Sequence, residues 1–334
     1  MLRHVRHHEI DRLQWDALIS QAANGLIYAL TWYLDIVSPG WEALLKEEQG
    51  RYVAALPLPV QRKFGLRYLK QPLFGQQLGL FYVVPPTAAD WAAVSWLLNK
   101  QVSYITRYAF NVPNAALASP ATLGMPGGLA RTYHLSLTAP YPALWAAYRP
   151  ERRRHLRKAQ AHGLVVEPST DINLLIRLFD ENTAHRITGM LGEAYQYPLL
   201  RTLYGAASRA GLGTIWQART PQGEVVALMF LLRFKKHIIY LFNCSTAAGK
   251  AMGAVSVMLD EFFRQHAGQD LCFDFESPGV PSLERFYGSF GSVAASYFYV
   301  SADHLPWPVR QLKAARMAWY RRRRPQPPAA NSPD

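Results

Sequence analysis

The acidic pair in the segment FDFES is the first candidate for acid–base chemistry in this chain. Asp274 and Glu276 alternate with Phe273 and Phe275, which predicts a short buried strand with both carboxylates on one face. Two carboxylates on one face can divide their ionisation, so that one has a raised pKa and acts as a base. The alternative is a structural pairing with Arg285 or with a helix amino terminus. We favour a functional role, because acidic residues in an apolar strand are costly without a partner.

A strongly basic segment, YRPERRRHLRKAQAHGLVV, runs from 148 to 166 and predicts a helix. Arg149, Arg153 and Arg157 are spaced to share one face, and Glu151 is the single acid among these bases. The helix is either a solvated surface or a site for phosphates of a nucleotide-linked acceptor, of tRNA or of coenzyme A. We favour phosphate binding, because so few acids interrupt the cations.

A further polar group lies in the segment ENTAHRITGM. Glu181 and His185 are four positions apart and would share a helix face, but no third ligand accompanies them, so we expect no metal site. Arg186 can contact an acidic acceptor, with Glu181 orienting it. A surface salt bridge is the simpler explanation of each of these residues alone.

Strands and helices in mixed order must position these side chains, and they occur in the same order in both halves of the chain. The sequence predicts an α+β (α/β) protein in which each half is a mixed, mainly antiparallel sheet flanked by helices. In the first half we expect helices at 11–22 and 31–37, strands at 41–46, 52–60, 66–69 and 78–84, a helix at 87–99 and a strand at 102–110. In the second half we expect helices at 171–184 and 195–210, strands at 214–219, 225–234 and 238–243, a helix at 251–266, a strand at 271–275, a helix at 282–289 and a strand at 292–300.

Length and composition indicate two folded domains. The 334 residues exceed the usual size of one core, and half of them are hydrophobic, which excludes a largely disordered chain. The formal net charge of +13 favours phosphates, nucleic acid or anionic membranes as partners. We expect a cytoplasmic protein, because the amino terminus has no apolar signal region and no apolar run has the length of a membrane span.

The order of elements in the second half resembles that of GNAT acetyltransferases. Three segments carry the likeness: the basic helix at 148–166, the loop and helix at 243–259, and FDFES followed by LERFYGSFG at 273–291. Together they resemble the FemAB-like and CelD-like group, which is related to the double-GNAT FemABX transferases that move amino acids onto cell-wall precursors. The resemblance implies two tandem GNAT-like domains, at 1–147 on the acceptor side and at 148–304, followed by a basic, Pro-rich tail at 305–334.

The same resemblance implies roles for particular residues. Tyr287, in a Phe-Tyr pair before Gly291, corresponds to the tyrosine that protonates the leaving thiolate, although a core aromatic would produce the same pair. The start of the long helix would hold the pyrophosphate of coenzyme A, or would be a plain capping loop. The expected donor-binding residues are Asn243, Gly249, Lys250, Gly253 and Ala254, and Gln76 and Gln77 would line an acceptor cleft.

The sequence therefore predicts an N-acyltransferase that moves an acyl group from acetyl-CoA or another acyl-CoA to an amine of a small or cell-envelope metabolite. One alternative is an aminoacyl-tRNA-dependent transferase, which the lack of a FemABX-type helical arm disfavours. Another is a non-catalytic module that binds RNA or an anionic membrane. A last helix at 309–320 carries an apolar stripe that suits a membrane surface, at the inner face of the membrane, or packing against the protein body.

Overall fold

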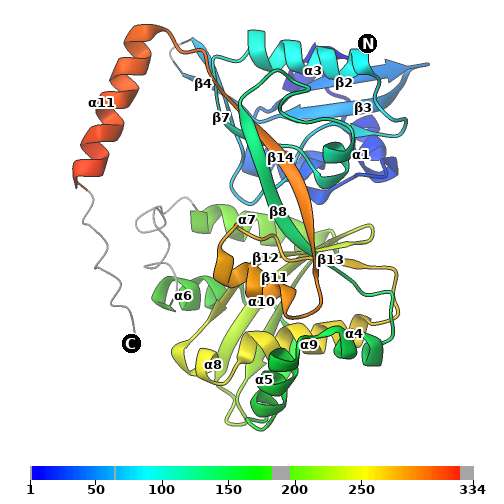
Figure 1. The fold of residues 1–334 in the computed structure, drawn as a ribbon, viewed down its shortest axis with the longest axis vertical. Helices are drawn as coiled ribbons and strands as arrows, with labels where there is room; N and C mark the ends of the chain where they lie inside the picture. The colour runs from blue at the N-terminus through cyan, green and yellow to red at the C-terminus, as the bar shows by residue number, and fades with distance from the viewer. Residues whose placement is uncertain (1, 64, 183–195, 324–334) are drawn as a thin grey trace.

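Two α+β halves form the protein, one above the other in Figure 1. The computed structural model describes residues 2–63, 65–182 and 196–323. Within these ranges no helix is both long and apolar enough to cross a membrane. Arg186 and His185 lie outside the described residues.

The first half has helices on a small antiparallel sheet and contributes four strands, β4, β5, β7 and β8, to a larger sheet. Side chains cap two of its helices: the Asp11 side chain accepts from the amides of Leu13 and Gln14 at the start of α1, and Thr87 forms a capping box with Asp90 at the start of α3. The elements are β1 (Arg3–Val5), η1 (His7–Glu9), α1 (Arg12–Gln21), η2 (Ile27–Ala29), α2 (Thr31–Val37), β2 (Glu42–Glu48), β3 (Arg51–Leu58), β4 (Val60–Lys63), β5 (Leu66–Lys70), β6 (Phe81–Tyr82), α3 (Ala88–Lys100), β7 (Tyr104–Ala109), η3 (Val112–Ala116) and β8 (Gly127–Ser136).

The second half has the same order of elements: helices first, then antiparallel strands, then a helix and a strand. Two neighbouring strands, β11 and β12, are almost continuous apolar runs, because both faces of the sheet are covered. The elements are α4 (Tyr141–Ala147), α5 (Pro150–Gln160), β9 (Val165–Ser169), α6 (Ile172–Asn182), α7 (Gln196–Arg209), β10 (Gly213–Arg219), β11 (Val225–Phe234), β12 (His237–Ser245), α8 (Ala247–Ala251), α9 (Ala254–His266), β13 (Cys272–Asp274), α10 (Pro281–Gly288), β14 (Val293–Asp303) and α11 (Trp307–Arg323).

One large sheet connects the halves. Its order is β4-β5-β7-β14-β8-β13-β12-β11-β10-β9, and a separate sheet has the order β1-β2-β3-β6. Strand β14, from the second half, pairs with β8 from Val293 to Val300 and with β7 from Tyr299 to Asp303. Figure 1 shows β8 and β14 side by side, running from the upper half into the lower. The halves therefore exchange strands, and the division between 147 and 148 stays a prediction.

Two hydrophobic cores cover the two faces of the second-half sheet. On one face, α6 and α7 pack in a core that continues into the first half. On the other face, α5, α9 and α10 pack around Phe263, Phe273 and Phe275. The face covered by α6 and α7 therefore also meets the first half of the protein. The opposite face is covered by helices of the second half.

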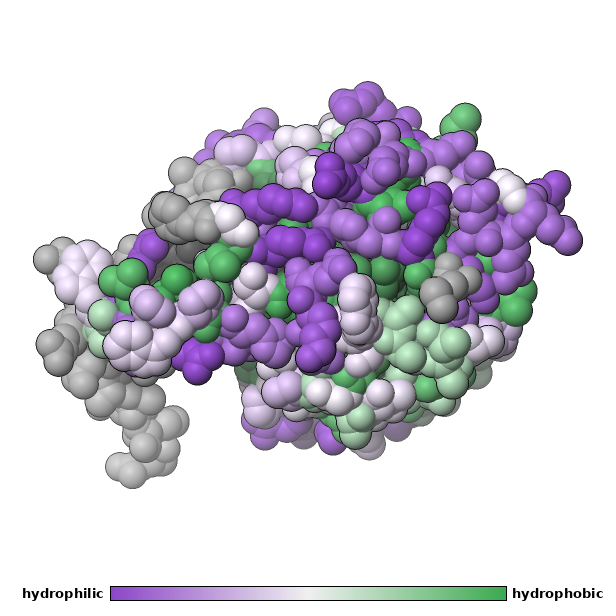
Figure 2. Space-filling view, turned by 90° about the horizontal axis from the view of Figure 1, so that it is seen from above, coloured by the Kyte–Doolittle hydropathy of each residue, from purple (hydrophilic) through white to green (hydrophobic). Residues whose placement is uncertain are grey.

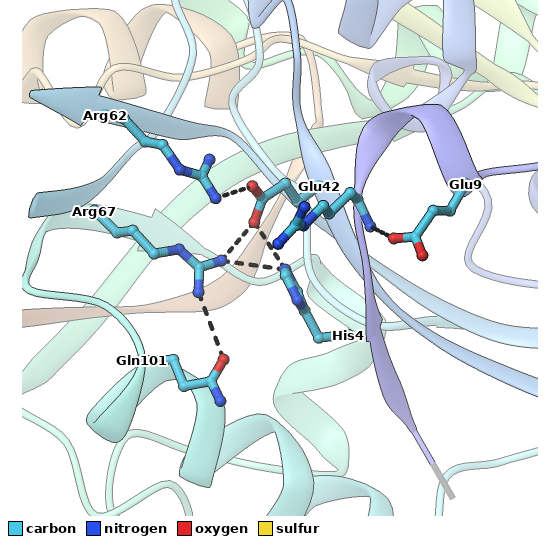
Figure 3. A network of polar contacts seen from close by, with 7 residues as sticks. His4, Glu9, Glu42, Arg62, Arg67 and Gln101 are labelled. Atoms are coloured by element: carbon cyan, nitrogen blue, oxygen red, sulfur yellow. Dashed lines mark hydrogen bonds and ion pairs between the residues drawn. The ribbon is translucent and has the colours of Figure 1, made fainter. Parts of the chain in front are cut away.

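A buried ionic network stabilises the edge of the first half. The Glu42 carboxylate, 3% exposed, accepts from Arg62 at 2.5 Å and from Arg67 at 2.5 Å, and lies 2.7 Å from the His4 ring nitrogen (Figure 3). Arg67 also reaches Gln101 on the chain just after α3. Burial opposes ionisation of Glu42, but these cations outweigh it and hold its pKa below the ordinary value. The network joins the small sheet to strands β4 and β5.

The predicted α+β class, with mainly antiparallel sheets flanked by helices, is confirmed, and most boundaries agree within a few residues. The predicted helix at 251–266 corresponds to α9, which begins only at Ala254 because Gly253 before it adopts a left-handed φ of 69°. The short helix α8 before this glycine was not predicted. The predicted strand at 271–275 ends at Asp274, so Glu276 lies beyond it with a φ of 49°. Strand β8 was not predicted.

Candidate active site

Strands β12 and β13 separate at the centre of the second half. They pair in parallel from His237 with Cys272 to Ile239 with Asp274, and there the pairing stops, although β12 continues to Ser245. At the same place the register between β12 and β11 shifts, so that Leu241 is an extra residue in β12. A bulge leaves such a residue outside the ladder. The outer edge of β12 is thus open beyond Ile239.

Glu276 is located where the strands separate. Its left-handed backbone directs it to the first half, where the Tyr28 hydroxyl donates to Oε1 at 2.7 Å, across 248 positions of sequence. Burial raises the pKa of Glu276 to about 8, the Asp274 charge adds to the increase, and hydrogen bonds from Tyr28 and the Gln76 backbone oppose it. A carboxyl with this pKa can exchange a proton near neutral pH.

Asp274 holds the turn that carries Glu276. Its carboxylate accepts from the Thr132 hydroxyl and from the Glu276 amide, the latter at 2.9 Å, and lies 3.3 Å from Nε2 of His134. Thr132 in turn accepts from the Ser277 amide at 3.3 Å. These contacts fix the backbone of the turn, so Asp274 supports the position of Glu276.

Two tyrosines, Tyr240 and Tyr287, lie near the point where β12 and β13 separate, in the core that contains Phe273 and Phe275. The Tyr287 ring stacks on Phe275, with centroids 4.7 Å apart and planes at 27°. Tyr240 also contacts Phe275, and its buried hydroxyl has no hydrogen-bond partner among the described residues. Burial raises the pKa of both phenols, and the Glu276 charge adds to the effect on Tyr287. Both hydroxyls therefore stay protonated and able to donate at neutral pH.

A cavity of about 810 Å³ opens between the halves on the Glu276 side. Its lining combines cations and carboxylates, among them Arg107, Arg131, Glu276 and Glu284. Gln76 also lines it and donates to the Ser277 carbonyl at 3.0 Å. The expected Gln77 lies behind this surface: it is 3% exposed, donates to Gln76 and accepts from the Val112 amide. Gln77 therefore supports the loop and does not line the cavity.

A second cavity, of about 1120 Å³, lies between α5 and the start of α9. Its cationic lining consists of Arg152, Arg154, Arg157, Lys158 and Lys250. Gly253 precedes α9 here, and a β-carbon on it would come within 2.5 Å of the His155 ring. Phe286 lines the same cavity and contacts Tyr287, with centroids 5.8 Å apart, so the cavity adjoins the tyrosines.

Backbone amides at this second cavity divide into two groups. Those of Gly249, Lys250 and Gly253 already donate within the loop, to Thr246 and to the Lys250 carbonyl. Those of Ala254 and Val255 begin α9 and have no acceptor in the helix itself. An anion in this cavity would therefore meet the Val255 amide and the cations of α5 rather than the amides of the loop.

Other residues of the predicted donor site have packing roles. Gly249 is buried, and a β-carbon on it would come within 2.2 Å of the Val226 carbonyl oxygen. Ala254 is fully buried in the second core, and Asn243 is on β12 outside the lining of both cavities.

The basic helix has one structural arginine and several that face the cavity. Arg152 donates to Ser256 at 2.7 Å and to Ser289 at 2.8 Å and lies over the ring of Phe286, so it fastens α5 to α9 and α10. Arg157 lines the second cavity, as expected, whereas Arg153 does not. Arg154, on the neighbouring face, does so instead.

The remaining predicted substrate residue, Glu181, is exposed in the last turn of α6 and lies outside both cavities. Its predicted partner Arg186 falls outside the described residues. In the described part of the chain no group of three or more His, Cys, Asp or Glu side chains is arranged to hold a metal ion.

Comparison with known proteins defines the class. Residues 146–281 match the family described as "Acetyltransferase (GNAT) domain". A search of curated protein sequences finds no significant match. Among solved structures, FemX aligns with a TM-score of 0.63 at 15% identity, covering 93% of this chain and 99% of FemX.

Two further structures align over similar lengths. A conserved protein of unknown function from Bacteroides thetaiotaomicron gives a TM-score of 0.57 at 12% identity, with 90% of this chain and 99% of that chain covered. L-PGS from Bacillus licheniformis gives 0.52 at 12% identity, with 92% and 96% covered. Residues 146–281 thus match a GNAT acetyltransferase domain. The whole chain shares the fold of FemX and L-PGS.

Several residues of the site could not be predicted from the sequence around them. Thr132 and His134 reach FDFES because β8 pairs with β13, and Tyr28 reaches it because η2 of the first half packs against the second half. Tyr240 had a weak signal, since it is the one hydroxyl in the apolar run IIYLF.

Proposed function

We propose that this protein is an N-acyltransferase that takes an acyl group from acyl-CoA and transfers it to an amine bound between the halves. The observation that carries the proposal is the position of Glu276, a carboxyl with a pKa of about 8, at the point where β12 and β13 separate. A base of this kind is what deprotonation of an attacking amine requires.

The donor fits the second cavity and the open edge of β12. The diphosphate and 3′-phosphate of coenzyme A would meet the first amides of α9 and the cations Arg154, Arg157 and Lys158. The acyl-carrying arm would then extend past Phe286 to the tyrosines. The unpartnered hydroxyl of Tyr240 is one polar atom that a ligand there would satisfy.

The reaction would proceed by direct transfer. The amine nitrogen attacks the thioester carbonyl, the C–N bond forms, and the C–S bond breaks. Glu276 takes the proton that the amine loses, and the Tyr287 hydroxyl supplies a proton to the departing sulfur. Asp274 acts on the base indirectly, because it fixes the turn through the Glu276 amide.

Donor binding is the first test. Calorimetric titration of the protein with coenzyme A should show binding with a Kd in the range of about 1 μM to 1 mM, as is typical of enzyme substrates. The double variant Arg154→Glu, Arg157→Glu should weaken it by at least about tenfold, through loss of charge-assisted contacts. Arg153→Glu on the same helix is the matched control and should bind nearly as the wild type does.

A transferase fed by aminoacyl-tRNA is the second candidate, favoured by the cations of α5. Here Arg153→Glu should weaken binding along with the others, because a large polyanion contacts the helix more broadly. If coenzyme A does not bind and labelled amino acid moves from charged tRNA to an amine, the acyl-CoA proposal fails and this candidate replaces it.

A further inference from the structure

Helix α11 extends away from the rest of the molecule. Figure 1 shows it beside the body, joined to it at its first residues. Its contacts with the body lie near that end: Lys313 pairs with Asp303 at 3.0 Å and lies over the ring of Tyr104, and Arg310 reaches the Leu305 carbonyl. These contacts fix the base of the helix, and most of its described side chains from Trp307 to Trp319 are exposed.

One exposed face of α11 is apolar. Pro308, Leu312, Ala315 and Trp319 follow one another at spacings of three or four, so they form a stripe, and all four are exposed. Leu312 is 71% exposed and Trp319 is 48% exposed, while Trp307 at the start of the helix is 71% exposed. Figure 2, seen from above, shows hydrophobic residues beside hydrophilic ones on the left-hand lobe, where Figure 1 places α11.

The charges of the helix all have one sign. From Trp307 to Arg323 the sequence contains no Asp or Glu, and its cations are Arg310, Lys313, Arg316, Arg321, Arg322 and Arg323. Asp303 pairs with Arg310 and with Lys313. A partner of α11 must therefore combine negative charge with an apolar region.

We propose that α11 docks on the surface of an anionic lipid bilayer. Headgroup phosphates attract the cations, and the apolar stripe enters the boundary with the acyl chains, where tryptophan is favoured. RNA would satisfy the cations but would leave Leu312 exposed, so the apolar stripe favours lipid. This interaction goes beyond acyl transfer and does not depend on it, since α11 contributes no residue to either cavity described above.

The full chain is tested by flotation with two kinds of vesicle at physiological ionic strength, one of phosphatidylcholine alone and one with about 30% phosphatidylglycerol. The wild type should float with the anionic vesicles and stay behind with the neutral ones. Leu312→Glu should reduce the bound fraction at least about tenfold, because the stripe no longer enters the lipid. Arg321→Glu with Arg322→Glu should reduce it by a similar factor.

Matched controls come from other exposed positions. Leu13 on α1 is 85% exposed, so Leu13→Glu makes the same chemical change elsewhere and should bind as the wild type does. Arg51→Glu with Arg209→Glu makes the same change of net charge at exposed sites away from α11 and should retain most binding.

Three results would overturn the proposal. They are equal flotation with neutral and anionic vesicles, unchanged flotation of Leu312→Glu, and no flotation at all while a double-stranded RNA binds and Arg321→Glu with Arg322→Glu abolishes that binding. The last result would assign α11 to RNA instead.

Discussion

Replacing Glu276 by glutamine should stabilise the folded protein, and the gain should grow as the pH rises from about 4.5 to about 8. The unfolded chain ionises this carboxyl near its ordinary pKa of 4.5, whereas the folded protein keeps the proton until about pH 8. Between these values the folded state binds more protons than the unfolded state, so the contribution of Glu276 to stability falls as the pH rises. Glutamine does not ionise and avoids that loss.

The expected size follows from the same two values. At 1.36 kcal/mol per pKa unit, a pKa of about 8 in place of 4.5 sets a ceiling of about 5 kcal/mol. Because Glu276 borders a cavity open to water, we expect Glu276→Gln to raise the free energy of unfolding by about 1–3 kcal/mol, which corresponds to a rise in Tm of a few degrees. The amide oxygen can still accept from Tyr28, so the hydrogen bond is retained.

The assay is chemical unfolding of the wild type and of Glu276→Gln at pH 5 and at pH 9. The gain in unfolding free energy should be near zero at pH 5 and reach its full value at pH 9. Glu284→Gln, at the same cavity, is the control and should show no such gain. The reasoning is refuted if Glu276→Gln has the same effect at both pH values, or if it destabilises the protein more at pH 9.

Three further changes test other parts of the structure. Tyr287→Phe should lower the rate of acyl transfer about a hundredfold or more and leave the calorimetric affinity for coenzyme A unchanged, since it removes only a proton donor. Gly253→Ala should weaken coenzyme A binding and lower stability by more than Gly40→Ala does; both residues have a left-handed φ, but only the first brings a β-carbon within 2.5 Å of His155. Glu42→Gln should destabilise the protein by about 2–4 kcal/mol at pH 7 in urea unfolding, and the loss should shrink as the pH falls through the lowered pKa of Glu42, because protonation removes the same ion pairs from the wild type.

Local patterns in the sequence were enough to predict most elements. The run from Val225 to Phe234 is one strand, β11, as predicted, and Thr87 caps α3 through side-chain chemistry visible in the sequence. The break between α8 and α9 was harder to predict, because a glycine inside a helical pattern is compatible with either a continuous helix or a left-handed turn. Strand β8 was missed, since it opens with Gly127 and Gly128, which weaken a strand pattern.

Only those parts of the candidate site that depend on neighbouring residues in the sequence could be predicted. Asp274 and Glu276 could be named from FDFES, but their different environments could not, because these depend on Thr132 and Tyr28 from the first half. The choice between Arg153 and Arg154 on α5 depends on how that helix is rotated against α9, and helical spacing alone does not determine the rotation. Sequence periodicity shows which residues share a face, whereas the packing of halves decides which face meets the cavity.

The pH dependence of coenzyme A release from acetyl-CoA, with an amine acceptor present, tests the central claim most directly. In the wild type kcat/KM should rise with pH and level off near pH 8, because the base must lose its proton before it can accept one from the amine. In Glu276→Gln the rate should fall at least about a hundredfold and this rise should disappear. A variant that retains both the rate and the pH profile of the wild type would show that Glu276 is not the base.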